Sequence, residues 1–506
     1  MNFKKIIIAT SCITILSFGS ILKVNAATTN QTVVVDVNSI EGAVSQRAAG
    51  YLGNDITDSL PSDSVYSSYW RPLNLQLYSW IVPRSSSSGW TFPGLNRARS
   101  SNAYYQIKVY GDPGDLSLGL DSPWGRRIAG IVTSATATNY AKIQLDIFNE
   151  PDYTGYWPGT GNLSDPRILA AWRIAHDAAR SVNPNIQIVG PNVTGGISGS
   201  INWLKTVFLP TMKNENRLPD VLSWHEINTP IDQINNRVQD MRNFMAQNGM
   251  NVPHISINEY NYQNSHLLPG RGVQFIDQLE KAKVQSASRA CWEEVSGGSY
   301  DCAPHINGFL DSTGKPRSIW WVYKSYADMM GSVVTSSDTA GFASYATKDE
   351  VNGVYKVLVG SISSEPTLLV KLSGLDDVNH SIKIEKIPST GQTALIAPTL
   401  VREYQAGASG SVLEVTIDGV QSQQAFLVTA TRIGGATTPT SPTPTPSPLP
   451  SSAPLLGDFD GDRDVDINDY NFLKSEYGKT GSSADLDGNG RVNMVDYNIL
   501  SNNFGR

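Results

Sequence analysis

The sequence of 506 residues predicts three folded parts in series: a (β/α)8 TIM barrel, an antiparallel β-sandwich and a small all-α module at the C-terminus. Strand-like and helix-like runs alternate over about residues 50–331 without hairpin signals, which favours a closed parallel sheet. Short alternating runs between Gly, Asp and Ser turns continue to Arg432, which is the pattern of a sandwich. A Thr/Pro/Ser-rich segment then precedes a tail that contains an internal repeat.

The N-terminus has the pattern of a secretory signal. Lys4 and Lys5 precede an apolar run, and Val24-Asn25-Ala26 forms a small-x-small cleavage site. We expect residues 1–26 to be removed and the mature protein to be secreted and extracellular. No other apolar run approaches the length needed to cross a bilayer, so no membrane partner is expected. A formal net charge of −7 provides no basic surface for nucleic acid.

Changes of composition divide the mature chain into five segments. Residues 27–48 form an N-terminal segment, and its apolar run is a candidate strand of the sandwich. The other segments are the barrel, the sandwich, the Thr/Pro/Ser linker and the tail, at residues 49–332, 333–433, 434–454 and 455–506. The linker has too little apolar content to fold, so we expect it to be extended.

Two strand-like runs of the barrel segment end on or near a glutamate. Residues 144–150 stop at Glu150 because Pro151 cannot donate to a strand ladder. Residues 254–260 end in the same way, with Glu259. Counting strand–helix units places Glu150 on the fourth barrel strand and Glu259 on the seventh. Residues 73–77 and 106–110 are the candidates for the second and third strands.

Paired glutamates at the ends of barrel strands indicate glycoside hydrolysis. Active sites of these barrels form at the carboxyl ends of the strands, where a carboxyl group between an apolar wall and solvent is suited to donate a proton. A second carboxylate about 5–5.5 Å away can attack the anomeric carbon of a sugar. The alternative is that Glu150 and Glu259 are ordinary exposed carboxylates, but the occurrence of both in the same context favours catalysis.

The barrel segment resembles the retaining glycoside hydrolases of clan A, and it is similar to glycoside hydrolase family 39, in which a sandwich follows the barrel. The resemblance implies that Glu150 is the acid/base and Glu259 the nucleophile, with no cofactor for catalysis. It also implies that Asn149 holds the sugar 2-hydroxyl. His225 and Trp292 match substrate-binding places after the sixth and eighth strands.

Aromatic side chains crowd the ends of the two glutamate strands. Aromatic rings stack against sugars, so we expect some of them to line subsites, with packing as the alternative for each. They are Tyr153, Tyr156, Trp157, Tyr260 and Tyr262. Glu226, Glu293 and Glu294 are rival carboxylates. Asp146 shares a strand face with Glu150 by alternation, and we interpret it as a structural polar residue.

The tail contains a duplicated loop that is rich in oxygen ligands. Each copy places Asp or Asn side chains at the offsets that Ca2+ requires, with one backbone carbonyl between them. The first copy comprises Asp458, Asp460, Asp462, Asp464 (through its carbonyl), Asp466 and Asp469. The second copy comprises Asp485, Asp487, Asn489, Arg491 (through its carbonyl), Asn493 and Asp496. We expect two Ca2+ ions, against the alternative of a solvated acidic run.

The tail resembles a dockerin, the module that attaches enzymes to a cohesin domain of a scaffoldin within a cellulosome. Each loop ends in Asp, and similar sequences after Asp469 and Asp496 predict that each loop opens a helix. The resemblance implies a cohesin partner and a cellulosome-bound location. Arg463 stands where the turn of such a loop uses Gly, which predicts strain in the first site. Residues 467–468 and 494–495 differ from the Ser/Thr pairs of type I dockerins, so the cohesin type stays open.

The main hypothesis is a secreted, cellulosome-associated retaining glycosidase that cleaves β-linked plant cell-wall polysaccharide or its oligosaccharides. The alternative is a non-catalytic carbohydrate-binding protein that keeps the barrel as a scaffold. Intact Glu150 and Glu259 favour the enzyme. Beyond the signal, Cys291 and Cys302 are candidates for a disulfide, with two buried thiols as the alternative.

Overall fold

The computed structural model describes two compact units, Met1–Gly435 and Ala436–Arg506. The described residues are 31–52, 56–82, 89–109, 113–195, 199–261, 265–290, 308–433, 456–459, 465 and 467–503. The expected signal segment, the linker and the Cys291–Cys302 pair lie outside this part of the chain. Among the described helices, none combines the length and the hydropathy that a membrane crossing requires.

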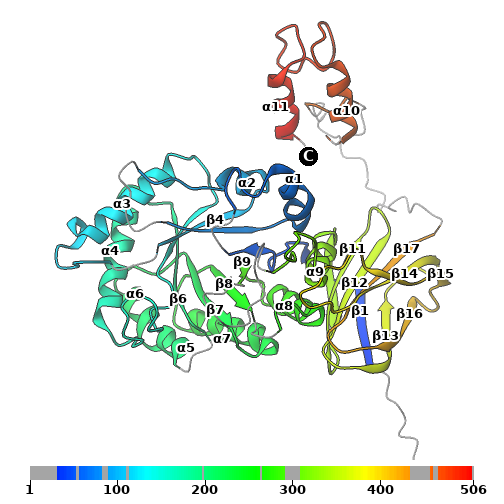
Figure 1. Cartoon of the computed structure of the whole chain (residues 1–506), viewed down its shortest axis with the longest axis horizontal. Coiled ribbons are helices and arrows are strands. Elements are labelled where there is room, and N and C mark those ends of the chain that lie inside the picture. Colours follow the sequence, from blue (N-terminus) through cyan, green and yellow to red (C-terminus); the bar gives the residue numbers. More distant parts are fainter. Residues whose placement is uncertain are drawn as a thin grey trace, which may run out of the picture. The chain divides into compact units, whose positions relative to one another are not determined.

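Eight parallel strands close into a barrel in sequence order, as the alternation of strands and helices predicts (Figure 1). They are β2 (Gly50–Tyr51), β3 (Leu77–Ile81), β4 (Tyr104–Val109), β5 (Ile143–Ile147), β6 (Gln187–Val193), β7 (Val221–Ile227), β8 (His254–Asn261) and β9 (Ser286–Arg289). The expected second strand at residues 73–77 is wrong, because Leu73 ends a short 3-10 helix and Asn74 turns the chain with a φ of 46°. The expected third strand at residues 106–110 overlaps β4.

Helices follow most barrel strands and cover the outer face of the barrel. The α-helices of this unit are α1 (Asp63–Val65), α2 (Leu95–Ser100), α3 (Pro123–Thr136), α4 (Pro166–Val182), α5 (Ser200–Trp203), α6 (Leu209–Asn214), α7 (Ile234–Gln247), α8 (Pro269–Lys281) and α9 (Ser318–Ala327). Short 3-10 or π segments are η1 (Tyr66–Trp70), η2 (Arg71–Leu73), η3 (Gly119–Asp121), η4 (Leu204–Phe208) and η5 (Ile231–Gln233). Asp165 caps α4 by accepting the Arg167 N–H, with Pro166 tolerated in the first turn.

The second region of this unit is a nine-stranded, mostly antiparallel sheet with the order β15-β14-β17-β12-β11-β10-β1-β13-β16. Its strands are β1 (Gln31–Ala43), β10 (Ser332–Ser337), β11 (Phe342–Asp349), β12 (Val354–Ser361), β13 (Glu365–Ser373), β14 (Asn379–Ile387), β15 (Thr399–Gly407), β16 (Val412–Val420) and β17 (Ala425–Arg432). Inward side chains from both halves of the sheet share one buried cluster, which is consistent with a sandwich.

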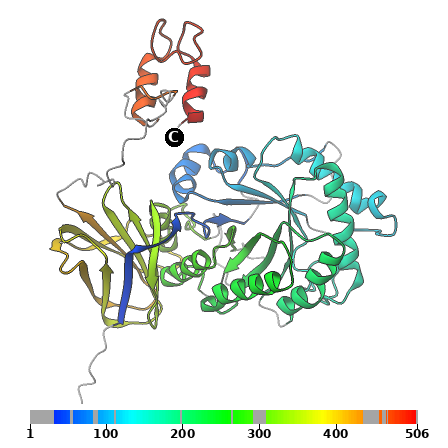
Figure 2. The same ribbon diagram turned by 180° about the vertical axis from the view of Figure 1, so that it is seen from behind.

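The N-terminal strand β1 joins this sheet although the whole barrel separates it in sequence from the other strands. It pairs antiparallel with β10 and parallel with β13. Figure 2 shows it as the blue strand among the yellow-green strands of the sheet.

Helix α8 packs closely against β12 and so ties the barrel to the sheet. A Cβ atom on Gly270 would lie 2.1 Å from the Ser361 carbonyl oxygen, so only glycine permits this approach. The buried side chains of Tyr345 and Leu358 belong to the core cluster of the barrel. The sheet therefore supports the barrel wall near β8 and β9.

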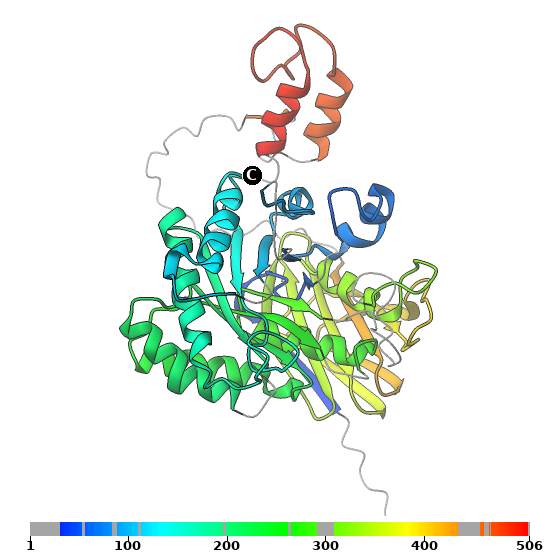
Figure 3. The ribbon, with the colours of Figure 1, turned by 60° about the vertical axis from the view of Figure 1, so that its left-hand side comes forward.

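The described residues of the C-terminal unit form two helices, α10 (Ile467–Glu476) and α11 (Met494–Asn503). Figures 1 and 3 show them side by side, drawn in orange and red. A small buried core joins them, made of Val465, Leu473, Ala484, Val492 and Leu500. Each helix begins at the equivalent place of the sequence repeat, as the duplicated loops predict.

Candidate active site

The chain makes an unusual turn where β5 ends, and this turn carries Glu150. Phe148 and Glu150 have φ values of 74° and 46°, in the left-handed region that non-glycine residues rarely adopt. The Glu150 N–H donates to the Asn192 carbonyl at 2.9 Å and so fixes the turn to β6. Strand alternation fails here, because Phe148 is buried beside Trp124 and Trp172 while the Glu150 side chain keeps 15% exposure.

Three titratable side chains from three strands meet at this end of the barrel. His225 and Glu259 are register partners on β7 and β8. His225 Nδ1 lies 2.8 Å from Glu150 Oε1 and 3.5 Å from Glu259 Oε2. One carboxylate oxygen of each glutamate and a ring nitrogen of His225 lie within 4.8 Å of one another. The structure therefore brings together the two glutamates and the histidine that the sequence singled out.

Lys108 on β4 is a member of this cluster that sequence reasoning missed. Its ammonium donates to Glu259 Oε1 at 2.8 Å and lies 3.9 Å from Asp146 Oδ2. The side chain is completely buried, and Lys108 and Asp146 are register partners on β4 and β5. The available signal was the alternation of polar Gln106 and Lys108 with apolar neighbours, which marks an inward-facing pair.

Charges around Glu259 and His225 offset the effect of their burial. Burial alone would raise the pKa of Glu259, but the charges of His225 and Lys108 and the Lys108 hydrogen bond hold it below its ordinary value. Burial alone would lower the pKa of His225, but Glu259 and Glu150 raise it. These opposing effects favour an ionised Glu259 beside a protonated His225.

Asp146 lies below this cluster, inside the barrel. Its oxygens accept hydrogen bonds from the side-chain amides of Asn192 and Asn258, and burial raises its pKa. It has no exposed surface, so it supports the site from behind.

Glu226 faces the opposite side of β7 from His225. Its oxygens accept from the Trp224 indole at 2.7 Å, from Thr229 Oγ1 at 2.5 Å and from Arg237 at 2.5–2.9 Å. Glu226 is completely buried and fully engaged, so this rival carboxylate has a structural place. The rivals Glu293 and Glu294 lie outside the described residues.

Asn149 contributes an open acceptor beside Glu150. Its Oδ1 atom is buried and has no hydrogen-bond partner among the described residues, while its side chain hydrogen-bonds Tyr156. Burial, Glu259 and Glu150 together raise the pKa of the Tyr156 hydroxyl to about 12. Asn149 can therefore accept a hydrogen bond from a ligand hydroxyl group.

The loop after β5 presents aromatic side chains close to Glu150. Tyr153 and Tyr156 are 49% and 37% exposed, with ring centroids 6.0 Å apart. Trp157 is half-buried and stacks on Phe148 at 5.5 Å. The two tyrosines are accessible to a ligand, and Trp157 is partly so.

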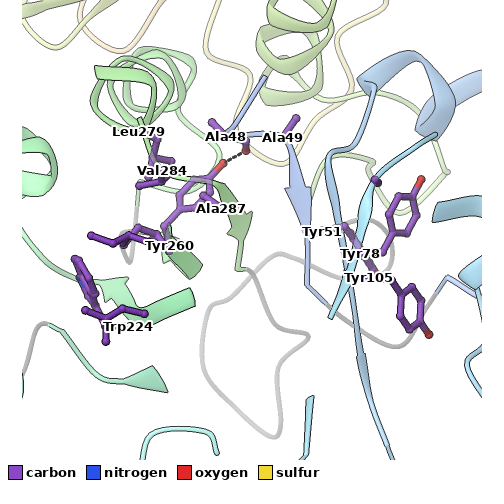
Figure 4. Packing of buried hydrophobic residues seen from close by; sticks show 14 of the residues in the cluster. Ala48, Ala49, Tyr51, Tyr78, Tyr105, Trp224, Tyr260, Leu279, Val284 and Ala287 are labelled. Carbon is purple, nitrogen blue, oxygen red and sulfur yellow. Dashed lines mark hydrogen bonds between the residues drawn. The ribbon is translucent and has the colours of Figure 1, made fainter. Parts of the chain in front are cut away.

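Tyr260 contradicts the expectation that it lines a subsite. It follows Glu259, so strand alternation points it out of the barrel, and it is completely buried. Its hydroxyl donates to the Ala48 carbonyl at 2.5 Å, as the dashed line in Figure 4 shows, and lies 2.7 Å from the Tyr323 hydroxyl. The other expected contacts, Tyr262 and Trp292, lie outside the described residues.

The second loop of the tail gathers carboxylates in a way that suits a cation. Carboxylate oxygens of Asp485, Asp487 and Asp496 lie within 4.8 Å of one another. Gly490 makes the sharp turn of the loop with a φ of 90°, which only glycine adopts readily. Asp496 Oδ1 accepts the Leu486 N–H at 2.7 Å. These residues fit Ca2+, which takes oxygen ligands in a flexible geometry.

The remaining expected ligands divide between the two loops. In the second loop, Asn489 Nδ2 donates to Asp487, and Asn493 Nδ2 donates to the Arg491 carbonyl at 2.9 Å. In the first loop, Asp469 accepts the Phe459 N–H at 2.6 Å. This bond is equivalent to the one from the Leu486 N–H to Asp496 in the second loop. Asp458 is described, but Asp460, Asp462, Asp464 and Asp466 lie outside the described residues, as does Arg463.

Comparisons of sequence place the chain beside two arabinofuranosidases. No family model matches the chain. A 3-O-α-D-galactosyl-α-L-arabinofuranosidase of Bifidobacterium longum subsp. longum is 25% identical over 317 residues, which cover 57% of this chain and 26% of that protein. A 3-O-β-L-arabinopyranosyl-α-L-arabinofuranosidase of Bifidobacterium pseudocatenulatum is 24% identical over 392 residues, which cover 68% and 39%. The chain thus spans well under half the length of these relatives.

Comparisons of structure show that the barrel and sheet together are a fold found in glycoside hydrolases. A protein from Neocallimastix frontalis matches with a TM-score of 0.67 and 23% identity, covering 80% of this chain and all of that one. A β-xylosidase from Caulobacter crescentus matches with a TM-score of 0.59 and 13% identity, again over 80% and 100%. A GH39 enzyme from Xanthomonas axonopodis pv. citri matches with a TM-score of 0.59 and 12% identity, over 80% and 98%.

Proposed function

We propose that the barrel is a retaining glycosidase that acts on plant cell-wall saccharides, with Glu150 as acid/base and Glu259 as nucleophile. The observation that carries this proposal is the approach of the two carboxylates to within 4.8 Å. Retaining glycosidases hold their carboxyl groups about 5–5.5 Å apart, whereas inverting enzymes need about 6.5–9.5 Å to admit a water molecule. The similarity to two arabinofuranosidases supports the same class of reaction.

In the first step, Glu150 gives its proton to the glycosidic oxygen while a Glu259 oxygen attacks the anomeric carbon. The bond to the leaving group breaks, and its electrons leave with the protonated oxygen. Lys108 and His225 favour the ionised form of Glu259 that this attack needs. The contact of His225 Nδ1 with Glu150 Oε1 orients the acid.

In the second step, a water molecule attacks the same carbon and gives a proton to Glu150. The bond between the carbon and Glu259 breaks. Two displacements restore the original anomeric configuration. Asn149, with its open buried oxygen, is the group that we assign to the sugar hydroxyl next to the reacting carbon. His225 Nε2 is a second buried polar atom without a partner among the described residues, and we assign it to substrate as well.

On the loop after β5, we propose that Tyr153 and Trp157 bind the sugar or the leaving group. Tyr262 and Trp292 keep the substrate-binding roles that the family resemblance implies. Tyr260 has no such role, because its ring is enclosed.

The first candidate substrate is an α-L-arabinofuranoside. Both curated relatives are named for release of an arabinofuranose unit that carries a second sugar. This choice replaces the β-linked polysaccharide that the sequence alone favoured. β-Xylosides are the second candidate, because structures with the same fold carry that name.

For the tail, we propose a Ca2+-binding dockerin that attaches a secreted enzyme to a cohesin within a cellulosome. The convergent oxygens of Asp485, Asp487 and Asp496 and the repeated loop–helix unit support it. Bound Ca2+ would neutralise these carboxylates and hold each loop against its helix.

The proposal is tested by assaying the purified chain on aryl α-L-arabinofuranoside, aryl β-D-xyloside, arabinan, galactan, xylan and β-glucan. We expect hydrolysis of the aryl arabinofuranoside, and complete loss of it in Glu259→Ala, with unchanged circular dichroism. Glu150→Ala should lose about 10²–10⁴-fold on substrates whose leaving group needs a proton. Absence of hydrolysis on the whole panel, together with calorimetric binding of a saccharide, would favour the non-catalytic alternative.

A further inference from the structure

Lys108 places a positive charge inside the barrel, where charged groups are rare. A buried ammonium is tolerated only with partners, and Lys108 has two carboxylates, Glu259 at 2.8 Å and Asp146 at 3.9 Å. The two contacts are unequal. The short hydrogen bond goes to Glu259, whereas the oxygens of Asp146 are shared with the amides of Asn192 and Asn258.

The two oxygens of Glu259 consequently have different surroundings. Oε1 accepts the hydrogen bond from Lys108, on the buried side. Oε2 faces His225 Nδ1 at 3.5 Å, on the side where Glu150 lies. One oxygen is held by a fixed cation, and the other is left for the reaction.

We propose that Lys108 is a positioning residue that keeps Glu259 ionised, directs its Oε2 atom to the anomeric carbon and makes Glu259 a good leaving group in the second step. This inference rests on the proposed function, because it assigns Glu259 as the nucleophile. Lys108 acts through Glu259 and does not contact the sugar, since it has no accessible surface.

The consequence for the glycosyl-enzyme follows from the same geometry. When Oε2 is bonded to the sugar, Oε1 becomes the carbonyl oxygen of an ester. A hydrogen bond from Lys108 to Oε1 withdraws electrons from that ester. When the bond between the sugar carbon and Oε2 breaks, its electron pair returns to Glu259 beside the ammonium. Neither step moves a proton to or from Lys108, so both steps balance without another reactant.

Other charged groups also act on Glu259, and the test must separate Lys108 from them. His225 on β7 adds positive charge, and the same ring nitrogen of His225 lies 2.8 Å from Glu150 Oε1. Asp146 on β5 lies on the far side of Lys108, and the Tyr156 hydroxyl interacts with both glutamates from the loop after β5. Of these groups, Lys108 is the one that donates a hydrogen bond to Oε1.

The experiment compares Lys108→Met with Lys281→Met and wild type in the full chain. Lys281 is a matched control, because it also pairs with a buried carboxylate, Asp277 at 2.6 Å, but on α8 outside the barrel. An opposite charge at this distance lowers a carboxyl pKa by about 1–3 units, so Lys108→Met should move the acidic limb of kcat/KM up by about that much. Breakdown of the glycosyl-enzyme should become rate-limiting, which gives a burst of aryl leaving group equal to the enzyme concentration.

Lys281→Met should keep the wild-type pH profile and show no burst. A Lys108→Met enzyme with the wild-type acidic limb and no burst would overturn the inference, while loss of activity in Glu259→Ala would leave the proposed function standing. If wild type hydrolyses no glycoside, the proposed function fails and the inference fails with it.

If Lys108→Met does not fold, wild type provides the test. Inactivation by a reagent that esterifies the nucleophile then reports the ionisation of Glu259. The inference predicts inactivation with an acidic limb below the ordinary glutamate pKa of 4.5. A limb above that value would overturn it.

Discussion

The barrel mouth and the second tail loop both gather carboxylates, but they balance the negative charge in different ways. In the barrel, the ammonium of Lys108 lies 2.8 Å from Glu259, and His225 stands between the two glutamates. In the tail, the partners of Asp485, Asp487 and Asp496 among the described residues are backbone N–H groups and one asparagine amide. In the barrel, the balancing cation belongs to the chain, whereas in the tail we propose that Ca2+ supplies the positive charge.

The largest expected effect is that a chelator unfolds the tail but leaves the activity of the barrel unchanged. Ca2+ binding should be coupled to folding of the tail, because the small core formed by its described residues cannot offset the repulsion of the acidic loops. Excess EDTA should therefore open residues 456–503 to limited proteolysis and abolish cohesin binding. Glycosidase activity of the same sample should not change.

The control for chelation is re-addition of Ca2+, which should restore protection of the tail. The second loop should hold its ion more tightly than the first, because Gly490 permits the turn with a φ of 90°, whereas the sequence predicts strain at the equivalent Arg463. Calorimetry that detects no Ca2+ uptake would contradict the proposal that the tail, unlike the barrel, depends on a bound metal ion.

A smaller effect is expected from Arg237→Met, which removes a cation from a buried carboxylate of the barrel that lies away from the catalytic pair. The substitution leaves the buried Glu226 without its cation, and such a loss costs about 3–5 kcal/mol of unfolding free energy. Activity per folded molecule should stay at the wild-type level, since Glu226 faces away from His225. Chemical denaturation and active-site titration measure the two quantities. If Arg237→Met unfolds with the same free energy as wild type, the ion pair of Arg237 with Glu226 does not stabilise the fold.

Sequence periodicity was sufficient for the barrel and the sheet, because both depend on regular alternation. The meeting of Glu150 with Glu259 followed from a different rule, since the carboxyl ends of parallel barrel strands form one site. Periodicity could not reveal the turn at Phe148 and Glu150, where two positive φ values break the strand pattern. It also misplaced the second strand, because Leu73 and Leu75 alternate with polar residues as in a strand but are buried at the end of a 3-10 helix and in the loop before β3.

Long-range charge pairing is the other feature that sequence did not disclose. A lysine in a strand usually reaches solvent, and the partner of Lys108 lies 151 residues further along the chain. Tyr260, in contrast, was predictable. Alternation from Glu259 places it on the outer face of β8, where it is found.

The smallest expected effect is the dependence of stability on pH at Glu259. Its pKa is lower in the folded chain than the ordinary 4.5, so its ionised form stabilises the fold above that pH. This stability is lost as the pH falls through the folded pKa. The stability difference between wild type and Glu259→Gln should therefore shrink below about pH 4.5, by about 1.4 kcal/mol for each unit of pKa shift. Thermal unfolding from pH 3 to pH 6 measures it, and a difference that does not vary with pH would contradict the ion pair with Lys108.

The central claim is that Glu150 and Glu259 act as a retaining pair, and the stereochemistry of the first-formed product tests it most directly. A proton NMR time course of aryl α-L-arabinofuranoside hydrolysis would follow the anomeric signal before mutarotation. The carboxylate approach of 4.8 Å or less predicts that the α-anomer appears first. A first-formed β-anomer would contradict the account, because it would require a water molecule between the two glutamates.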